Sequence, residues 1–403
     1  MNLIDRPKYI SHIVQRLNKG MMLVLIGQRR VGKSFLLRLL KTWIETNRPE
    51  ASIAYINKEL KDFDTIKTAD HLYNFALETL PEGGENYLLI DEVQDIEGYE
   101  NALRSLYAEE RCQIVITGSN AYIFSSELST RLSGRYMEIP VHSLGYDEFL
   151  NFHGLRDSDD SLRLFLTIGG LPGLSRCKVD DEAEVRDYLQ GVYNTILMKD
   201  ILMRHKIRNV PFLENLSHFI ADNIGKLFST HNISNYMKSQ GEKISESSVS
   251  DYVRFICNSL LANQVMRYNI HGKKLLETLN KFYFADHGLR NLLCGFNLLG
   301  SIEKIMENVV YNHLLIHGWK VAVGLLRSAE IDFVATRGDE KVYLQITYLL
   351  SSEDTVKREF GNLAAIKDNY PKIVVSMDPV GGEFPQYPGI RHYTLRKFLT
   401  TFA

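Results

Sequence analysis

The sequence lacks most of the features that mark secreted, metal-stapled or membrane proteins. Its four cysteines, Cys112, Cys177, Cys257 and Cys294, form no CxxC pair and no zinc-ligand spacing, which predicts buried thiols in a reducing compartment. It has no apolar run near the roughly 20 residues that a membrane helix needs, and its first residues lack the apolar core of a secretory signal. We therefore expect a cytoplasmic protein that makes no contact with a membrane.

An excess of either charge is also missing. Of the 403 residues, 47 are Lys or Arg and 49 are Asp or Glu, which gives a formal net charge of −2. A chain so close to neutral has no general attraction to nucleic acid, so any basic surface must be local. The sequence carries no internal repeat or low-complexity segment, and its length predicts several domains.

What the first part of the chain does have is a regular alternation of short apolar runs and amphipathic stretches. Strands alternating with helices predict an α/β fold with a parallel sheet and right-handed crossovers. The predicted strands are Met21–Ile26, Ser52–Asn57, Tyr87–Asp91, Gln113–Thr117 and Tyr136–Pro140, and the predicted helices are Lys33–Thr46, Ala69–Leu80 and Tyr99–Glu109.

A phosphate-binding loop follows the first predicted strand. Gly27–Ser34 (GQRRVGKS) fits GxxxxGK[ST], a pattern whose glycines let the backbone turn so that its N–H groups face a phosphate. Lys33 is predicted to neutralise the β- and γ-phosphates, and Ser34 to bind Mg²⁺. The residues predicted to contact ATP are Gly27, Gln28, Arg29, Arg30, Val31, Gly32, Lys33, Ser34 and Phe35.

Two acids end the third predicted strand, YLLIDE. Asp91 is predicted to bind Mg²⁺ and Glu92 to polarise the attacking water. Alone this is a weak signal, because a buried strand that ends in solvated acids looks the same. Together with the upstream loop it predicts an ATPase with ATP and Mg²⁺ as cofactors.

These motifs resemble a family of bacterial and archaeal AAA+-like ATPases whose C-terminal part is a domain of unknown function. The shared segments follow one order over nearly the whole chain: GQRRVGKS, LLIDEVQ, ITGSNA, RLSGRY, GGLPG at Gly169–Gly173, KFYFADHGLR and EIDF at Glu330–Phe333. The resemblance implies a P-loop AAA+ core, a helical segment, a winged helix and a small α/β domain similar to PD-(D/E)XK nucleases, the restriction-endonuclease-like fold.

The resemblance also implies further site residues. At the end of the fourth predicted strand, Thr117, Ser119 and Asn120 are candidates for a sensor of the γ-phosphate, the alternative being a plain Ser/Asn turn. Arg131 and Arg135 are candidates for an arginine finger that stabilises transition-state charge in a neighbouring subunit. The alternative for both is a surface arginine, and a finger acting in trans requires a homo-oligomer.

Four domains are predicted on this basis. They are residues 1–153 for the AAA+ core, 154–224 for a helical lid segment, 225–299 for the winged helix and 300–403 for the nuclease-like domain. The winged helix rests on a helix from Ser245 to Leu261, with Ser245 as its N-cap, followed by two short strands at Val265–Tyr268 and Leu275–Leu276.

Residues 225–275 carry the local positive charge. This segment contains seven basic residues and three acids, an excess of +4. The basic residues are Lys226, Lys238, Lys243, Arg254, Arg267, Lys273 and Lys274, and the acids are Glu242, Glu246 and Asp251. A winged helix with this excess is a candidate for DNA binding. Asp251, in the helix from Ser245 to Leu261, opposes phosphate contact, and winged helices also serve as packing modules, so both interpretations stay open.

The nuclease-like motif is incomplete. Such sites place two or three carboxylates and a lysine around a divalent metal. Glu307 and Asp332 match the early acids, but Gln345 replaces the second acid and Thr347 the lysine, with Lys357 as a candidate substitute. We expect a degenerate site retained for binding. The alternative is that Glu307 and Asp332 are merely solvated or salt-bridged.

Three functions follow from these patterns. The first is an AAA+-type ATPase that couples its nucleotide state to movement of the winged-helix and nuclease-like module on DNA. The second is a slow ATP-binding switch that serves as a scaffold for a protein partner. The third is an ATP-dependent nuclease, which Gln345 and Thr347 disfavour.

Overall fold

Two units make up the chain. The first comprises Met1–Val141 with Asn258–Leu260, and the second comprises His142–Cys257 with Leu261–Ala403. The structure, a computed structural model, describes residues 4–121, 132, 134–205, 207, 209–241, 244–327 and 329–403. All four cysteines are free, as predicted, but each is only partly buried, so the prediction of buried thiols is wrong. In these described ranges, no helix has both the length and the apolar character needed to cross a membrane.

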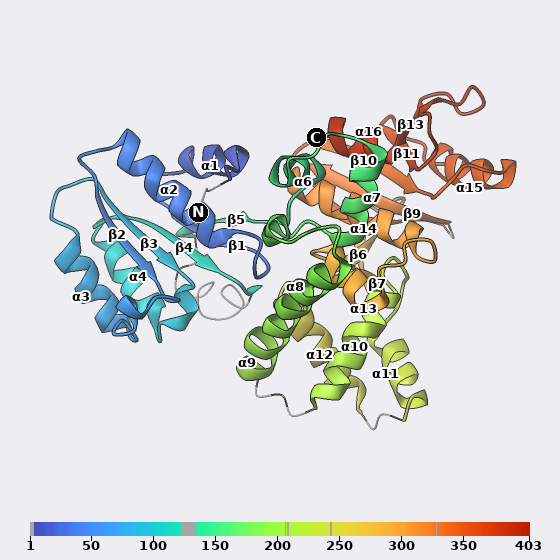
Figure 1. The fold of residues 1–403 in the computed structure, drawn as a ribbon. Helices are drawn as coiled ribbons and strands as arrows, with labels where there is room; N and C mark the ends of the chain where they lie inside the picture. Colours follow the sequence, from blue (N-terminus) through green and yellow to red (C-terminus); the bar gives the residue numbers. More distant parts are fainter. Residues whose placement is uncertain are drawn as a thin grey trace. The chain divides into compact units, whose positions relative to one another are not determined.

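The first unit is built on a sheet of five parallel strands (Figure 1). The strands are β1 (Met22–Ile26), β2 (Ser52–Asn57), β3 (Asn86–Asp91), β4 (Gln113–Gly118) and β5 (Tyr136–Pro140), in the spatial order β2-β3-β4-β1-β5. The sequence pattern predicted each of them to within one residue at either end, and the prediction of a parallel sheet is confirmed.

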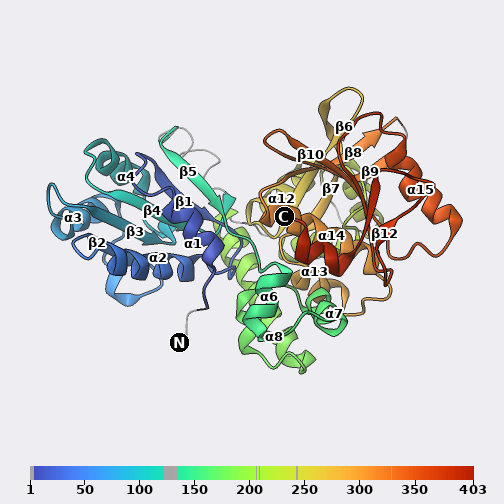
Figure 2. The same cartoon turned by 90° about the horizontal axis from the view of Figure 1, so that it is seen from above.

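Helices cover both faces of this sheet. α1 (Pro7–Val14) and α2 (Lys33–Asn47) lie on one face, and α3 (Ala69–Thr79) and α4 (Tyr99–Ala108) lie on the other (Figures 1 and 2). Because side chains alternate along a strand, the strands are apolar on both sides. Met22 and Val24 of β1 belong to the core beneath α3 and α4, while Leu23 and Leu25, which alternate with them, are fully buried on the other side.

The strand order positions the predicted nucleotide motifs. All five strands run in the same direction, so their carboxyl ends share one edge of the sheet, where ligands bind in α/β folds. β4 lies between β1 and β3. The loop after β1, the acids at the end of β3 and the polar residues at the end of β4 are therefore neighbours.

The second unit contains a mixed sheet of eight strands. They are β6 (Ala262–Asn269), β7 (Lys274–Phe284), β8 (Lys320–Leu326), β9 (Ala329–Arg337), β10 (Glu340–Ile346), β11 (Lys372–Ser376), β12 (Gly382–Glu383) and β13 (Ile390–Thr394), in the order β12-β13-β11-β10-β9-β8-β6-β7. α14 (Ile302–Ile316) packs on β7 to β10, and α15 (Glu353–Ala364) packs on β9 to β11 and β13. Phe360 and Leu363 of α15 share one core with Val334, Tyr343 and Val374.

Further helices precede and flank this sheet. They are α6 (Tyr146–His153), α7 (Asp159–Ile168), α8 (Glu182–Thr195), a π-helix (Ile196–Leu202), α9 (Met203–His205), α10 (Val210–Asp222), α11 (Thr230–Ser239), α12 (Glu246–Asn258), α13 (His287–Cys294) and α16 (Leu395–Thr401). The N-cap predicted at Ser245 is confirmed, since its Oγ accepts a hydrogen bond of 3.1 Å from the N–H of Ser248.

The two strands predicted as a wing are part of the large sheet. β6 pairs in parallel with β8 through Arg267 and Val323, and β7 extends over 11 residues where only Leu275–Leu276 was predicted. Polar residues in the middle of β7 interrupt its apolar pattern, which is why its length was missed. The strands on either side of residue 300 thus share one sheet, and the division into a winged helix and a separate C-terminal domain stays a prediction.

Two of the family segments pack directly against each other. The N–H of Gly170 donates to Asp286 Oδ2 at 2.9 Å, and Asp286 also caps α13 by accepting from Gly288. A Cβ at Gly169 would lie 2.4 Å from Asp286 Oδ1, and one at Gly288 would lie 2.1 Å from the carbonyl oxygen of Ile168. The glycines of GGLPG and ADHGLR are therefore required for the end of α7 to approach the start of α13.

Candidate nucleotide site

The backbone of the loop Gly27–Ser34 takes the tight path that its glycines allow. A Cβ at Gly27 would lie 2.1 Å from the carbonyl oxygen of Val141, so no larger residue fits there without moving the chain. Gly32 has φ +101° and is the N-cap of α2. The loop thus leads straight into a helix N-terminus, where backbone N–H groups and the helix dipole favour an anion.

The Lys33 side chain lies across this loop. It is 4% exposed, and its Nζ donates to the carbonyl oxygens of Gly27 at 2.8 Å and Gln28 at 2.9 Å. Carbonyl oxygens are weak partners for a buried ammonium compared with phosphate oxygens. This arrangement fits a lysine that can exchange its loop partners for a nucleotide.

A buried arginine that sequence reasoning missed holds the same loop from outside. Arg6, directly before α1, is 3% exposed, and its Nη1 donates to the carbonyl oxygen of Val31 at 2.9 Å. Its guanidinium also lies 4.3 Å from the centre of the Tyr9 ring. Arg6 is far from the motif in sequence and belongs to no pattern of its own, so only the fold reveals it.

Asp91 and Thr117 connect the ends of β3 and β4. Thr117 Oγ1 donates to Asp91 Oδ1 at 2.6 Å and accepts the backbone N–H of Glu92 at 2.9 Å. Burial raises the pKa of the Asp91 carboxyl, although the Thr117 and Ser34 hydroxyls and Lys33 oppose that rise. Thr117 thereby links the side chain of Asp91 to the backbone of Glu92.

The other oxygen of Asp91 is what a metal site requires. Oδ2 is buried and makes no hydrogen bond within the described part of the chain. A buried carboxylate oxygen without a partner is costly, and Mg²⁺ prefers such oxygen ligands. The Ser34 hydroxyl is close enough to Asp91 to affect the pKa of its carboxyl. Asp91 and Ser34 therefore fit the predicted pair of Mg²⁺ ligands.

Glu92 has an uncommon backbone conformation, and two side chains donate hydrogen bonds to its carboxylate. Its φ of +55° is left-handed, which non-glycine residues seldom adopt and which often accompanies function. Ser119 Oγ donates to Glu92 Oε2 at 3.1 Å, and Gln94 Nε2 donates to the same oxygen. Burial would raise the pKa of Glu92, but Lys33, Arg29 and these two donors outweigh burial and lower it. An ionised carboxylate at this place can act as a base.

The remaining predicted ATP contacts are distributed around the loop. Gln28 and Asn120 are buried, and both polar side-chain atoms of Gln28 lack a hydrogen-bond partner among the described residues. Arg30 is exposed and has a positive φ of +69°. Phe35, in the first turn of α2, lies against the Arg38 guanidinium at 4.2 Å.

Of the two arginine-finger candidates, only Arg135 lies within the described residues. Arg131 lies outside the described residues. Arg135 directly precedes β5, its carbonyl oxygen accepts from Met22 at the start of β1, and its guanidinium lies 5.6 Å from the Tyr107 ring. It is therefore at the amino edge of the sheet, opposite the edge that carries the phosphate loop. A role in trans stays a prediction.

In the second unit, the three residues predicted for the degenerate nuclease-like site do come together. Lys281 of β7 forms ion pairs with Glu307 and Asp332, and the N–H of Asp332 donates to Gln345 Oε1 at 2.7 Å. The lysine at this cluster is thus Lys281, whereas the predicted substitute Lys357 is exposed on α15. The signal in the sequence was a lysine within the apolar strand KFYF.

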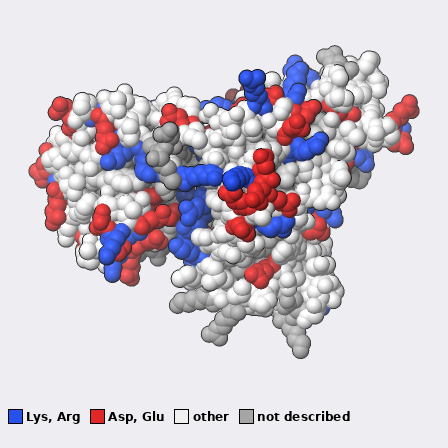
Figure 3. Space-filling view, in the orientation of Figure 1, with Lys and Arg blue, Asp and Glu red and all other residues white. Residues whose placement is uncertain are grey.

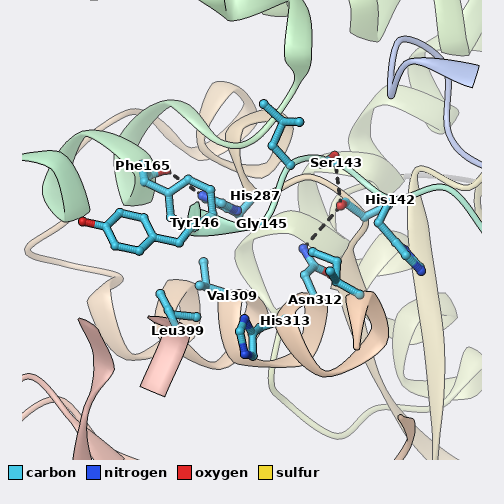
Figure 4. A pocket seen from close by; sticks show the side chains of 13 residues that line it. His142, Ser143, Gly145, Tyr146, Phe165, His287, Val309, Asn312, His313 and Leu399 are labelled. Carbon is cyan, nitrogen blue, oxygen red and sulfur yellow. Dashed lines mark hydrogen bonds between the residues drawn. The ribbon is translucent and has the colours of Figure 1, made fainter. Parts of the chain in front are cut away.

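A small pocket elsewhere in the second unit carries three histidines, His142, His287 and His313 (Figure 4). His287 Nε2 bonds the carbonyl oxygen of Phe165 at 2.7 Å, and His313 Nε2 bonds that of Phe402 at 2.6 Å. These two rings are engaged with backbone oxygens, which gives them a packing role.

The helix predicted to face DNA neutralises its own arginine. Arg254 Nη2 lies 2.7 Å from Asp251 Oδ1, one turn away on α12, and both side chains are more than half exposed. Acidic and basic side chains are also interspersed over the face shown in Figure 3. Of the residues that made up the predicted basic excess, Glu242 and Lys243 lie outside the described residues.

The chain matches known protein families and relatives over most of its length. Residues 19–150 match the model of an AAA domain, and residues 159–299 match a domain of unknown function (DUF8612). An uncharacterized protein of Haemophilus influenzae is 34% identical over 378 residues, covering 93% of each chain. An uncharacterized protein of Methanocaldococcus jannaschii is 25% identical over 394 residues, covering 91% of this chain and 84% of that one.

Two solved structures share a distant likeness. The Aeropyrum pernix Orc1 protein in complex with DNA has a TM-score of 0.32 at 14% identity and covers 72% of this chain and 92% of its own. The replication initiator DnaA bound to AMPPCP and single-stranded DNA has a TM-score of 0.32 at 15% identity and covers 63% of this chain and 89% of its own.

Proposed function

Because the chain belongs to the same family as the Haemophilus influenzae protein and carries an AAA domain over residues 19–150, we propose that its first unit binds ATP with Mg²⁺ and hydrolyses it. The observation that carries the proposal is the hydrogen-bonded set Asp91–Thr117–Glu92 beside the Lys33 loop at one edge of a parallel sheet. A buried Asp91 oxygen without a partner within the described ranges completes it.

Each residue has a distinct part in the proposed reaction. Lys33 leaves the carbonyl oxygens of Gly27 and Gln28 to bind phosphate oxygens, and Ser34 and Asp91 hold Mg²⁺. When bound, Mg²⁺ offsets the negative charge on the phosphate oxygens. Glu92 polarises the attacking water, and its lowered pKa keeps it ionised and ready to accept a proton at neutral pH.

We further propose that the nucleotide state acts on the second unit. The N–H of Val141 donates to the carbonyl oxygen of Ile26, next to Gly27 of the phosphate loop, at 2.6 Å. Three residues later, the N–H of Leu144 donates to the carbonyl oxygen of Gly170 at 2.7 Å. The short segment from Val141 to Leu144 is thus bonded next to the phosphate loop at one end and to the GGLPG segment at the other. In this proposal, a movement of the loop on ATP binding is passed to the second unit through this segment.

DNA is the proposed target of this coupling, through the basic residues of α12 and the β6–β7 hairpin. The Arg254–Asp251 pair favours a second candidate. In that function, the chain is a slow ATP-dependent switch whose second unit binds a protein partner. A helix whose arginine is paired with its own aspartate has little net positive charge with which to attract phosphates.

The experiment that tests the proposal is ATP turnover by the full chain, with and without duplex or single-stranded DNA. Glu92→Gln serves as the control and is expected to retain ATP while turnover falls by about 10² or more, as for loss of a general base. Lys33→Ala is expected to lose nucleotide binding without unfolding.

The outcomes separate the candidates. Stimulation of turnover by DNA supports the DNA-coupled ATPase, whereas slow turnover that is indifferent to DNA supports the switch. Unchanged nucleotide affinity in Lys33→Ala contradicts the assigned site itself.

A further inference from the structure

Lys281 occupies the centre of an acidic cluster in the second unit. It lies on β7 with its side chain 1% exposed. Its Nζ is 2.7 Å from Glu307 Oε1 on α14, 2.7 Å from Glu330 Oε1 and 3.7 Å from Asp332 Oδ1, the latter two on β9. One ammonium therefore bridges three carboxylates from two separate elements.

Other groups also donate hydrogen bonds to two of these carboxylates. Tyr283, two residues along β7 from Lys281 and so on the same face, donates to Glu307 Oε1. Asp332 Oδ2 accepts the N–H of Ile346 at 2.8 Å. Glu307 thus contacts both the Lys281 ammonium and the Tyr283 hydroxyl, and Asp332 contacts both the ammonium and the backbone.

A supporting set of side chains holds the site together. Gln345 accepts from the N–H of Asp332 and donates its amide to Glu359 Oε2 at 2.7 Å. Glu359 in turn accepts from Arg358 at 2.8 Å. Gln345, which replaces an acid of the nuclease motif, therefore connects Asp332 to Glu359 of α15 through its neutral amide group.

The chemistry of such a cluster requires a cation. Three carboxylates this close repel one another unless a positive charge lies among them. In hydrolytic metal sites, that charge is a divalent ion held by two or three carboxylates. Here Lys281 makes contact with the oxygens that such an ion would need. No group of three or more His, Cys, Asp or Glu among the described residues has a geometry able to hold a metal ion.

The protonation of the cluster agrees with this. Burial would lower the pKa of Lys281, but Glu307, Asp332 and Glu330 outweigh burial and raise it, so the ammonium stays charged. Burial and Glu307 raise the pKa of Asp332 well above its usual range. With three carboxyl groups around one ammonium, the cluster thus keeps Lys281 charged and makes Asp332 a weaker acid.

We propose that Lys281 is the built-in cation of this cluster, in the place that a divalent metal ion takes in carboxylate sites. The cluster then holds β7, α14 and β9 together without metal, and it neither binds Mg²⁺ or Mn²⁺ nor cleaves nucleic acid. This inference concerns the second unit and is independent of the proposed ATPase.

Replacing Lys281 by an uncharged side chain of similar length is the direct test. In Lys281→Met, three carboxylates lose their cation, so the nucleotide-free full chain is expected to unfold at lower temperature, and Mn²⁺ is expected to restore much of that loss. Wild type is expected to gain no stability from Mn²⁺. Lys274→Met, an exposed lysine on the same strand, is the matched control and is expected to resemble wild type.

If Lys281→Met does not fold, Mn²⁺ binding to wild type is the test. It is measured directly, from the loss of the free-ion electron paramagnetic resonance signal. Wild type is expected to bind no Mn²⁺ without nucleotide. Stoichiometric binding to wild type that Asp332→Asn abolishes would overturn the proposal. A folded Lys281→Met that neither binds Mn²⁺ nor responds to it would overturn it as well.

Discussion

The guanidinium of Arg6 donates a hydrogen bond of 2.9 Å to the carbonyl oxygen of Val31, in the middle of the phosphate loop. Within one peptide unit, the carbonyl and the following N–H point in opposite directions because the unit is planar and trans. By holding the Val31 oxygen outward, Arg6 therefore holds the N–H of Gly32 inward, where a phosphate is predicted to bind. We therefore expect Arg6 to act as a positioning residue for the loop.

Removal of Arg6 is expected to weaken nucleotide binding more than catalysis. Arg6→Ala takes away a charge-assisted hydrogen bond, and loss of loop order is expected to lower ATP and ADP affinity by about tenfold with kcat little changed. Titration with a fluorescent nucleotide measures the affinity. Lys8→Ala, which removes an exposed positive charge from the neighbouring turn, is the control. Equal affinities for wild type and a folded Arg6→Ala would argue against the clamp.

Ser119 is expected to act on Glu92 and not on the nucleotide. Its hydroxyl and the Gln94 amide both donate to Glu92 Oε2, and both lower the pKa of Glu92. In Ser119→Ala or Gln94→Ala, kcat is expected to fall by about tenfold, the cost of one hydrogen bond in the transition state. The pKa of Glu92 rises without these donors, so the acid limb of the rate–pH profile should move to higher pH.

The same variants also test the γ-phosphate sensor predicted at this strand end. A sensor contacts the nucleotide, so its loss weakens ATP binding relative to ADP. If Ser119→Ala lowers ATP affinity and leaves the pH profile in place, Ser119 is the sensor and its bond to Glu92 is incidental.

The parts of the structure that the sequence predicted are those encoded by local patterns. β2 begins and ends at the predicted residues, Ser52 and Asn57, because apolar runs bounded by polar residues define buried strands. Gly27–Ser34 is equally local, since loop, lysine and helix start are consecutive. The parallel sheet then brings Asp91 and Thr117 together without further information.

The parts that were missed depend on contacts across the fold. Arg6 reaches Val31 from 25 residues away, and Lys281 reaches Glu307 across 26 residues, with no motif to connect either pair. In the sequence, Lys357 lies nearer than Lys281 to Asp332 and Gln345, but on α15 it is exposed to solvent. Similarly, β7 is long because it pairs with β6 from Lys274 to Phe284, and the sequence of one strand alone does not reveal such a pairing.

Asp286 offers a stability test of the contact between GGLPG and ADHGLR. It is fully buried and accepts N–H groups from Gly170, across the fold, and from Gly288 and Leu289 of its own helix. Asp286→Ala leaves these donors without partners, and the free energy of unfolding is expected to fall by about 2–4 kcal/mol. Urea unfolding measures it.

A second N-cap in the same unit provides the matched control. Asp181 caps α8 in the same way, through Ala183 and Glu184, but its bonds are exposed and local. Asp181→Ala is therefore expected to cost about 1 kcal/mol. Equal losses for the two variants would show that Asp286 is only a cap and that its bond to Gly170 adds nothing.

His287 makes the stability of the second unit depend on pH. Its ring is buried between α7 and α13 and bonded to the carbonyl oxygen of Phe165 at 2.7 Å. Burial lowers its pKa below 6.5, although Asp286 and Phe165 oppose the shift. Between that lowered pKa and 6.5, the unfolded chain binds more protons than the folded chain, so stability is complete above about pH 6.5 and falls as pH drops.

The expected slope is at most about 1.4 kcal/mol per pH unit for this one group. Urea unfolding between about pH 5 and pH 8 measures it. His287→Gln keeps a donor for Phe165 but does not titrate, so its unfolding free energy should vary less with pH than that of wild type. Part of the dependence will remain, because burial also lowers the pKa of His153 and His392. His271→Gln, at an exposed position, is the control, and an equal slope in all three proteins would remove His287 as the cause.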